Sequence, residues 1–158
     1  MTYPIHAFLP SHPGSTPVAS HRYLSLRLWK IMTILLIEDS KLLRTANARA
    51  LVKTGYQVIG AGDGEEGLRS ARETIPDLIL LDMLLPKITG LDVLKGLKGD
   101  ARTRNIPVMV LSGLSQAKEA KLVEDGAAAF FEKSEKMLDN DSADLIEVVK
   151  GVLANANN

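Results

Sequence analysis

Five polar side chains that could take part in chemistry stand where runs of aliphatic residues end. They are Glu38, Asp39, Asp82, Ser112 and Lys133. Carboxylates held close together repel one another unless a cation compensates them, and a site made only of oxygen ligands favours Mg²⁺. A lysine ammonium and a hydroxyl suit a phosphoryl group, because the first supplies a positive charge and the second a hydrogen-bond donor. The residue types therefore predict a site for magnesium and a phosphoryl group, provided that the fold brings the five together.

Each of these residues also has an ordinary structural explanation when it is taken alone. Glu38 and Asp39 could begin a helix. Asp82 could cap a loop, and Lys133 could simply end a strand in solvent. What favours a site is that all five share a position at the end of a strand.

The strand that leads to Asp82 shows how the fold would position such a group. Residues 78–81 are four consecutive aliphatic side chains, which do not alternate with polar ones. A strand of this kind is buried on both faces, as in a parallel sheet covered by helices. Pro86 and Gly90 interrupt the chain before the next helix. The strand would therefore deliver Asp82 to the carboxyl edge of the sheet, where open α/β folds hold their ligands.

Predicted strands and helices alternate along the chain from residue 33. Ser40 is a good N-cap, and the second helix places Leu68, Ala71 and Ile75 on one apolar face. We predict strands over residues 33–37, 57–61, 78–82, 107–111 and 127–132. We predict helices over residues 41–54, 65–74, 90–98, 115–125 and 142–154.

This alternation predicts the fold class. Five strands and five helices connected by short loops form an α/β fold, a doubly wound five-stranded parallel sheet in the flavodoxin-like order 2-1-3-4-5. The first and third strands are neighbours in this order. Glu38 and Asp39 should therefore converge with Asp82 at one edge of the sheet.

Composition limits the classes of function. The 158 residues suffice for one domain, and 19 basic residues balance 19 acidic ones, so we expect no direct DNA binding. There is no cysteine, which excludes disulfide and thiol chemistry. No apolar run approaches the roughly 20 residues of a membrane helix, and no signal peptide is evident. We expect a cytoplasmic protein without membrane contact.

The first 31 residues differ from the rest. Four of the seven prolines and all three histidines lie within residues 1–21, without periodicity. We predict a disordered extension over residues 1–31 and a domain over residues 32–158. Met32 directly precedes the first predicted strand, so one hypothesis is that translation starts there; the intact mass of the native protein tests it.

The motifs resemble the receiver domain of two-component response regulators, over about residues 32–153. The resemblance rests on four segments in this order and spacing: residues 34–40, residues 77–82 with Pro86 and Gly90, residues 110–113, and residues 130–133. No output domain is evident, so the chain looks like a single-domain regulator of the chemotaxis type. The resemblance implies a protein that supports only its own phosphorylation and dephosphorylation and is otherwise not an enzyme.

The resemblance also implies a role for each residue. Asp82 looks like the phosphoacceptor, taking a phosphoryl group from a sensor histidine kinase or a phosphotransfer protein. Ser112 and Lys133 would contact the phosphoryl oxygens. Glu38 and Asp39 would hold Mg²⁺ together with Asp82 and the backbone carbonyl of Leu84.

A switch is implied as well. Phe130 stands where the family places its switch aromatic, three residues before Lys133. It would turn inward as Ser112 moves, and so change the face formed by helix 4, strand 5 and helix 5, where an output protein would bind. Plain core packing of Phe130 is the alternative.

Three residues depart from the family pattern. Ser134 stands where the family usually has a proline in a cis peptide, which implies a loop of different shape or mobility. Leu84 and Leu114 lie two residues after Asp82 and Ser112, where the family often has polar side chains that influence the hydrolytic water. We therefore expect slow self-dephosphorylation.

Two other functions remain open. A degenerate receiver could bind its partner without phosphorylation, although the intact acidic set and Lys133 disfavour this. An enzyme on the same fold is the other alternative. The segment after the first strand does not suit a flavodoxin, residues 82–84 lack the Asp-x-Asp of haloacid-dehalogenase phosphatases, and there is no P-loop.

Overall fold

A computed structural model describes residues 30–113, 119–133 and 143–156. All of these except Lys30 belong to one compact unit, Ile31–Asn158. Strands and helices alternate along this unit. In chain order they are β1 (Thr33–Ile37), α1 (Lys41–Lys53), β2 (Gln57–Ala61), α2 (Gly64–Thr74), β3 (Leu78–Asp82), α3 (Gly90–Gly99), β4 (Val108–Ser112), α4 (Glu119–Glu124), β5 (Ala129–Glu132) and α5 (Ala143–Ala156).

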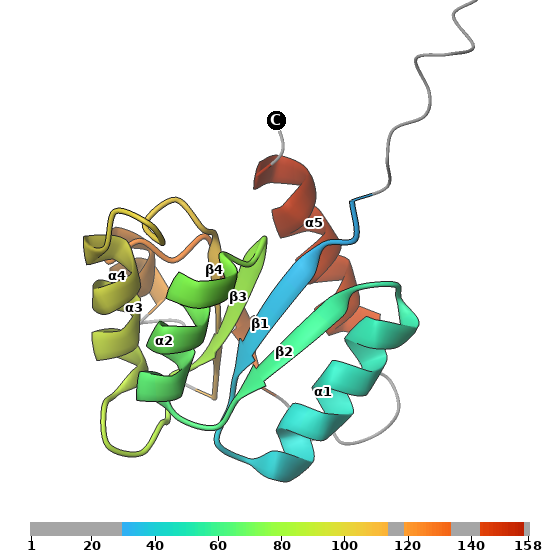
Figure 1. The fold of residues 1–158 in the computed structure, drawn as a ribbon, viewed down its shortest axis with the longest axis horizontal. Coiled ribbons are helices and arrows are strands. Elements are labelled where there is room, and N and C mark those ends of the chain that lie inside the picture. Colours follow the sequence, from blue (N-terminus) through green and yellow to red (C-terminus); the bar gives the residue numbers. More distant parts are fainter. Residues whose placement is uncertain (1–29, 114–118, 134–142, 157–158) are drawn as a thin grey trace, which may run out of the picture. The chain divides into compact units, whose positions relative to one another are not determined.

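The five strands form one parallel sheet in the order β2-β1-β3-β4-β5, which confirms the predicted fold class. Helices α1 and α5 cover one face, and α2, α3 and α4 cover the other (Figure 1). None of the helices in the described ranges combines the length and apolar character that crossing a membrane requires. The predicted disorder of residues 1–31 falls almost wholly outside the described residues, as do the first residues of the fourth predicted helix.

The central strands are buried on both faces because each supplies side chains to two cores. In β3, Leu78 and Leu80 pack beneath α1 and α5, while Ile79 and Leu81 pack beneath α2 and α3. All four side chains are inaccessible to solvent. Successive side chains of a strand point to opposite faces, so an unbroken aliphatic run satisfies both cores.

Helix ends follow from capping residues. The Ser40 hydroxyl accepts a hydrogen bond from the Leu43 N–H at 3.4 Å and so begins α1, as predicted. The predicted end of the second helix at residue 74 is confirmed, but the predicted place of Ile75 on its apolar face is wrong, because Ile75 is the left-handed C-cap of α2 at φ 45°. The backbone changes direction at this residue, and Ile75 is 49% exposed.

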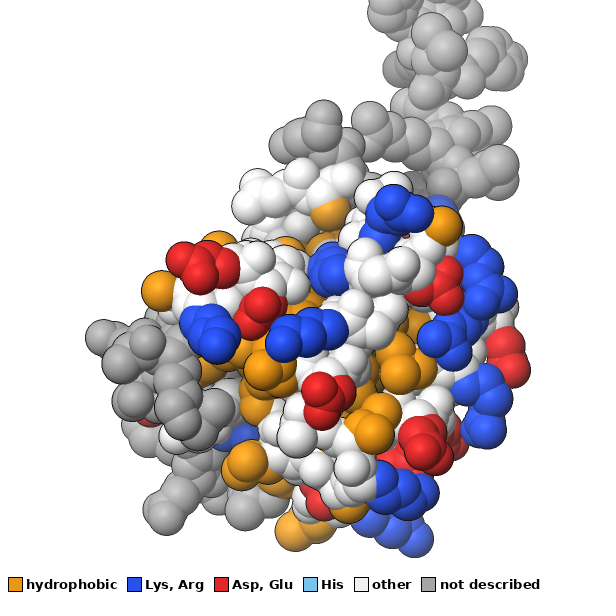
Figure 2. Space-filling view, turned by 90° about the vertical axis from the view of Figure 1, so that its left-hand side faces the viewer, with side chains coloured by type: hydrophobic (Ala, Val, Ile, Leu, Met, Phe, Trp, Pro, Cys, Tyr) orange, Lys and Arg blue, Asp and Glu red, His pale blue; other side chains and the backbone are white. Residues whose placement is uncertain are grey.

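Figure 2 views the molecule from the side of α2, α3 and α4. Acidic and basic side chains alternate there with hydrophobic ones, and no large area of one charge covers this side. The Arg72 guanidinium, for example, pairs with Asp100 at 2.9 Å. Mixed charge of this kind does not mark a binding surface for a polyanion.

Gly90 allows α3 to begin directly against the strand that carries Asp82. A Cβ atom at Gly90 would lie 2.5 Å from the carbonyl oxygen of Asp82 and 2.5 Å from Cα of Met83, and both of these are backbone atoms. The Gly90 N–H also donates to the Met83 carbonyl at 3.2 Å. Only a residue without a side chain permits this approach.

We therefore expect Gly90→Ala to lower the free energy of unfolding by about 2 to 3 kcal/mol, because the backbone must move to relieve the overlap. Gly99→Ala in the same helix is the matched control, since a Cβ there meets no atom within 4 Å. Alanine at that position should not lower the free energy of unfolding, because alanine favours the helix more than glycine does. Urea denaturation of both variants measures the difference, and equal stabilities would contradict the proposed contact.

Candidate phosphorylation and metal site

Three carboxylates meet at the carboxyl edge of the sheet, as the strand order predicted. One oxygen from each of Glu38, Asp39 and Asp82 lies within 4.8 Å of the others. Glu38 and Asp82 are buried, and Asp39 is exposed. They converge because β1 and β3 are adjacent and end at the same level.

Lys133 enters this cluster from the end of β5. Its Nζ atom lies 2.6 Å from Oε2 of Glu38 and 2.8 Å from Oδ2 of Asp82. The Lys133 N–H donates to the carbonyl oxygen of Ser112 at 3.0 Å, which holds the ends of β4 and β5 together. The ammonium therefore bridges two buried carboxylates that come from different strands.

Burial, hydrogen bonds and neighbouring charges act on the pKa values of Glu38 and Lys133. Burial raises the pKa of Glu38, the hydrogen bond from Lys133 opposes this shift, and the charge of Asp82 adds to it. For Lys133, burial alone would lower the pKa, but hydrogen bonds to Asp82 and Glu38 outweigh it, so the pKa is raised. One ammonium faces three carboxyl groups, so a hard divalent cation such as Mg²⁺ fits this all-oxygen set.

Backbone and side-chain donors orient the acidic groups. The Leu84 N–H donates to Oδ1 of Asp82 at 3.0 Å, and the Ser40 N–H donates to Oε1 of Glu38 at 3.1 Å. Arg44 was missed by sequence reasoning. Its Nη1 donates to the carbonyl oxygens of Glu38 at 2.5 Å and Asp39 at 3.3 Å. It thereby fixes the loop between β1 and α1, and the only signal in the sequence is a basic residue in the first turn after the acidic pair.

The remaining predicted residues are placed as follows. Ser112 is buried at the end of β4, on the strand next to Asp82. Phe130 is partly buried and packs against the core beneath α2, α3 and α4. The side chain of Leu84 is 69% exposed. Leu114 and Ser134 lie outside the described residues.

Comparison with known proteins identifies the class. Residues 34–147 match the family model of the response regulator receiver domain, and the chain belongs to this family. It is similar to the polar-differentiation response regulator DivK of Brucella ovis, with 34% identity over 102 residues that cover 64% of this chain and 83% of DivK. As a response regulator receiver, the chain is a signalling protein rather than a metabolic enzyme.

Solved structures agree with this assignment. The receiver domain of a signal transduction histidine kinase from Syntrophus aciditrophicus has a TM-score of 0.68 and 34% identity, over 78% of this chain and 91% of that one. The chemotaxis response regulator CheY4 of Vibrio cholerae has a TM-score of 0.70 and 24% identity, over 77% and 98% of the two chains, and supports the fold alone.

Proposed function

We propose that Asp82 accepts a phosphoryl group from the phosphohistidine of a sensor histidine kinase or phosphotransfer protein, and that the phosphorylated chain binds an output protein. The observation that carries this proposal is the double contact of Lys133 with Asp82 and Glu38. It supports the proposal because the nucleophile, a ligand of the metal and the cation for the phosphoryl group would then lie within one small volume. Membership of the receiver family supports the same assignment.

Each residue of the site would have its own role in phosphoryl transfer. An oxygen of Asp82 attacks phosphorus while the bond from phosphorus to the histidine nitrogen breaks, and the electron pair stays with the imidazole. The Leu84 N–H keeps the Asp82 carboxylate oriented. Glu38, Asp39 and Asp82, with the Leu84 carbonyl, would hold Mg²⁺, which supplies charge neutralisation on the phosphoryl oxygens. Lys133 then pairs with a phosphoryl oxygen, and positioning accounts for most of the rate.

Signalling would follow from the groups on β4 and β5. Ser112 hydrogen-bonds to the phosphoryl group, and Phe130 turns inward as the end of β4 moves. This changes the face of α4, β5 and α5, where the output protein binds. The effect is a shift between two arrangements whose balance the phosphoryl group alters.

Incubation with acetyl phosphate and Mg²⁺, followed by intact-mass measurement, tests the proposal. We expect a gain of one phosphoryl group that depends on Mg²⁺ and is prevented by a chelator. A chain that stays unmodified with Mg²⁺ and acetyl phosphate, and also with a phosphorylated histidine kinase, would favour a degenerate receiver.

We also predict a long-lived phosphorylated state. Hydrolysis needs a water in line with the bond to Asp82, and neither Leu84 nor Leu114 can orient one. Because the Leu84 side chain is largely exposed, its effect would come from its lack of a polar group rather than from covering Asp82. Every ~1.4 kcal/mol of barrier changes the rate about tenfold.

Phosphoryl loss should therefore be about tenfold faster or more in a Leu84→Asn, Leu114→Glu double variant. The decay of the phosphorylated mass with Mg²⁺ present measures it. Wild-type decay as fast as that of the double variant would show that the two leucines do not set the lifetime.

A further inference from the structure

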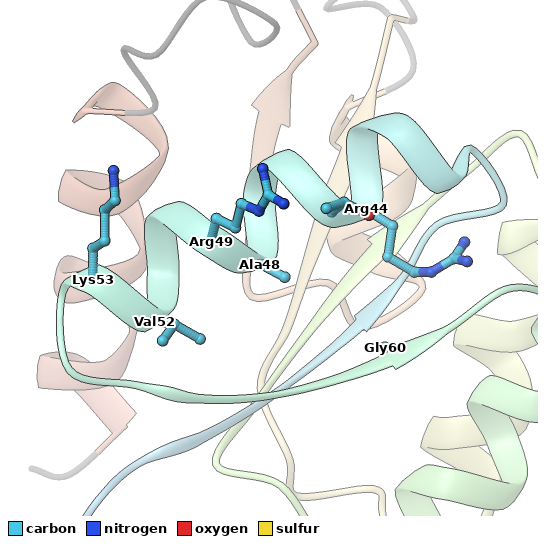
Figure 3. A pocket seen from close by; sticks show the side chains of 7 residues that line it. Arg44, Ala48, Arg49, Val52, Lys53 and Gly60 are labelled. Carbon is cyan, nitrogen blue, oxygen red and sulfur yellow. The ribbon is translucent and has the colours of Figure 1, made fainter.

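A shallow groove of about 500 Å³ runs between α1 and the edge strand β2, and Arg44 in its lining also contacts the loop of Glu38 and Asp39. Its apolar lining comes from Ala48, Val52 and Gly60, and Val52 is 55% exposed. Thr45 and the basic residues Arg44, Arg49 and Lys53 complete the lining. Figure 3 shows Val52 directed toward β2, with the charged ends of Arg49 and Lys53 directed away from it. Apolar surface therefore lies beside the strand edge, and positive charge forms an outer rim.

The charged residues of α1 are all basic. The helix has four basic residues and no acidic one. Among the described residues, Arg49 and Lys53 make neither an ion pair nor a hydrogen bond, whereas Lys150 on the other helix of this face pairs with Glu147 at 2.9 Å. The helix dipole favours Lys53, which lies in the last turn of α1, but it does not account for Arg49 in the middle of the helix. Within the described part of the chain, Arg49 and Lys53 therefore present positive charge to solvent without an acidic partner.

The strand beside the groove has a free edge. Among the described strands, β2 pairs with β1 alone. The Gln57 N–H donates to the Met32 carbonyl, and the Ala61 carbonyl accepts from the Glu38 N–H, so these two residues face β1. Backbone groups alternate in direction along a strand, which turns the N–H and C=O of Val58 and Gly60 outward. The Arg44 side chain covers the face of Gly60, with its Cδ 3.3 Å from the place that a Cβ would take, so an incoming strand would approach along the edge of β2.

We propose that this groove binds an extended acidic segment of a partner protein, which adds to the sheet as a strand beside β2. The main chain of the segment would bond to Val58 and Gly60. Its acidic side chains would face Arg49 and Lys53, and its apolar side chains would cover Val52. Polypeptide is the occupant that fits, because only an amide backbone complements a strand edge and because the chain as a whole has no net positive charge for nucleic acid. The proposal goes beyond phosphotransfer and does not depend on it.

The test uses the ¹⁵N-labelled full chain and two seven-residue peptides. In the first, the alternate residues that would face α1 are glutamate, valine and glutamate, with threonine at the other positions; in the second, lysine replaces each glutamate. We expect the glutamate peptide to shift the amide signals of β2 and α1. At saturation it should slow hydrogen exchange of the Val58 and Gly60 amides about tenfold or more, while Ile59, which faces β1, serves as the internal control. The lysine peptide should do neither.

Charge reversal gives a second measurement. An Arg49→Glu, Lys53→Glu variant should bind the glutamate peptide at least about tenfold more weakly. An Arg69→Glu, Lys121→Glu variant, which reverses two exposed charges on α2 and α4, should bind as wild type. If the reversed variant does not fold, Arg49→Gln, Lys53→Gln replaces it, and the exchange measurement on wild type stands without any variant. The proposal would be overturned if both peptides bound equally, if the glutamate peptide had no effect, or if it protected only other amides. Stronger shifts of the β2 and α1 amides by a single-stranded oligonucleotide would also overturn it.

Discussion

Asp82→Asn is expected to abolish phosphorylation by acetyl phosphate while leaving the fold intact. The amide is no nucleophile, and no other described carboxylate occupies the same place between Lys133 and the Leu84 N–H. The fold should survive because Lys133 keeps its contact with Glu38 and the Asn oxygen can still accept from Leu84. We expect a loss of no more than about 1 to 2 kcal/mol in the free energy of unfolding, because the weaker hydrogen bond to Lys133 is partly offset by relief of the repulsion between Glu38 and Asp82.

Intact mass after incubation with acetyl phosphate and Mg²⁺ measures the effect, and urea denaturation checks the fold. Asp144→Asn, in the exposed first turn of α5, is the matched control and should be phosphorylated as wild type. Phosphate uptake by Asp82→Asn at the wild-type rate on another residue would refute the assignment.

Lys133→Ala should destabilise the metal-free protein by about 3 kcal/mol, because it leaves Glu38 and Asp82 buried side by side without a cation. Mg²⁺ should restore most of this loss, since it supplies the missing charge to the same oxygens. We further expect the variant to accept a phosphoryl group but to switch poorly, because the group loses its positive partner on β5.

Urea denaturation with Mg²⁺ and with a chelator measures the stability, and partner binding with and without phosphorylation measures the switch. Lys150→Ala removes an exposed pair with Glu147 and serves as the control, with an expected cost below about 1 kcal/mol and no dependence on Mg²⁺. A Lys133→Ala protein as stable as wild type in chelator, or one that switches normally, would count against the role of Lys133.

The sheet could be predicted because its strands are unambiguous. The aliphatic run before Asp82 has no polar residue to place on a solvent face, so a doubly covered parallel strand was the one consistent solution. The convergence of Glu38 with Asp82 then followed from strand order alone.

Features that depend on three-dimensional contacts could not be predicted from the pattern of residue types in the sequence. Ile75 matched the apolar spacing of α2, but spacing does not reveal that this residue takes a left-handed conformation and lies half exposed. The contact of Arg44 with two loop carbonyls depends on the direction of its side chain. The same holds for Lys133, which contacts both Glu38 and Asp82. Residue type and spacing indicate charge and burial, but not which atoms meet.

The most direct measurement of the central claim is the position of the modified residue. The chain phosphorylated with acetyl phosphate and Mg²⁺ is reduced with borohydride, which converts an aspartyl phosphate to homoserine, and the peptides are then sequenced by mass spectrometry. Our assignment predicts homoserine at position 82 and unmodified aspartate at Asp39. Homoserine at another position with Asp82 unchanged, or phosphate retained on a serine or histidine, would contradict it.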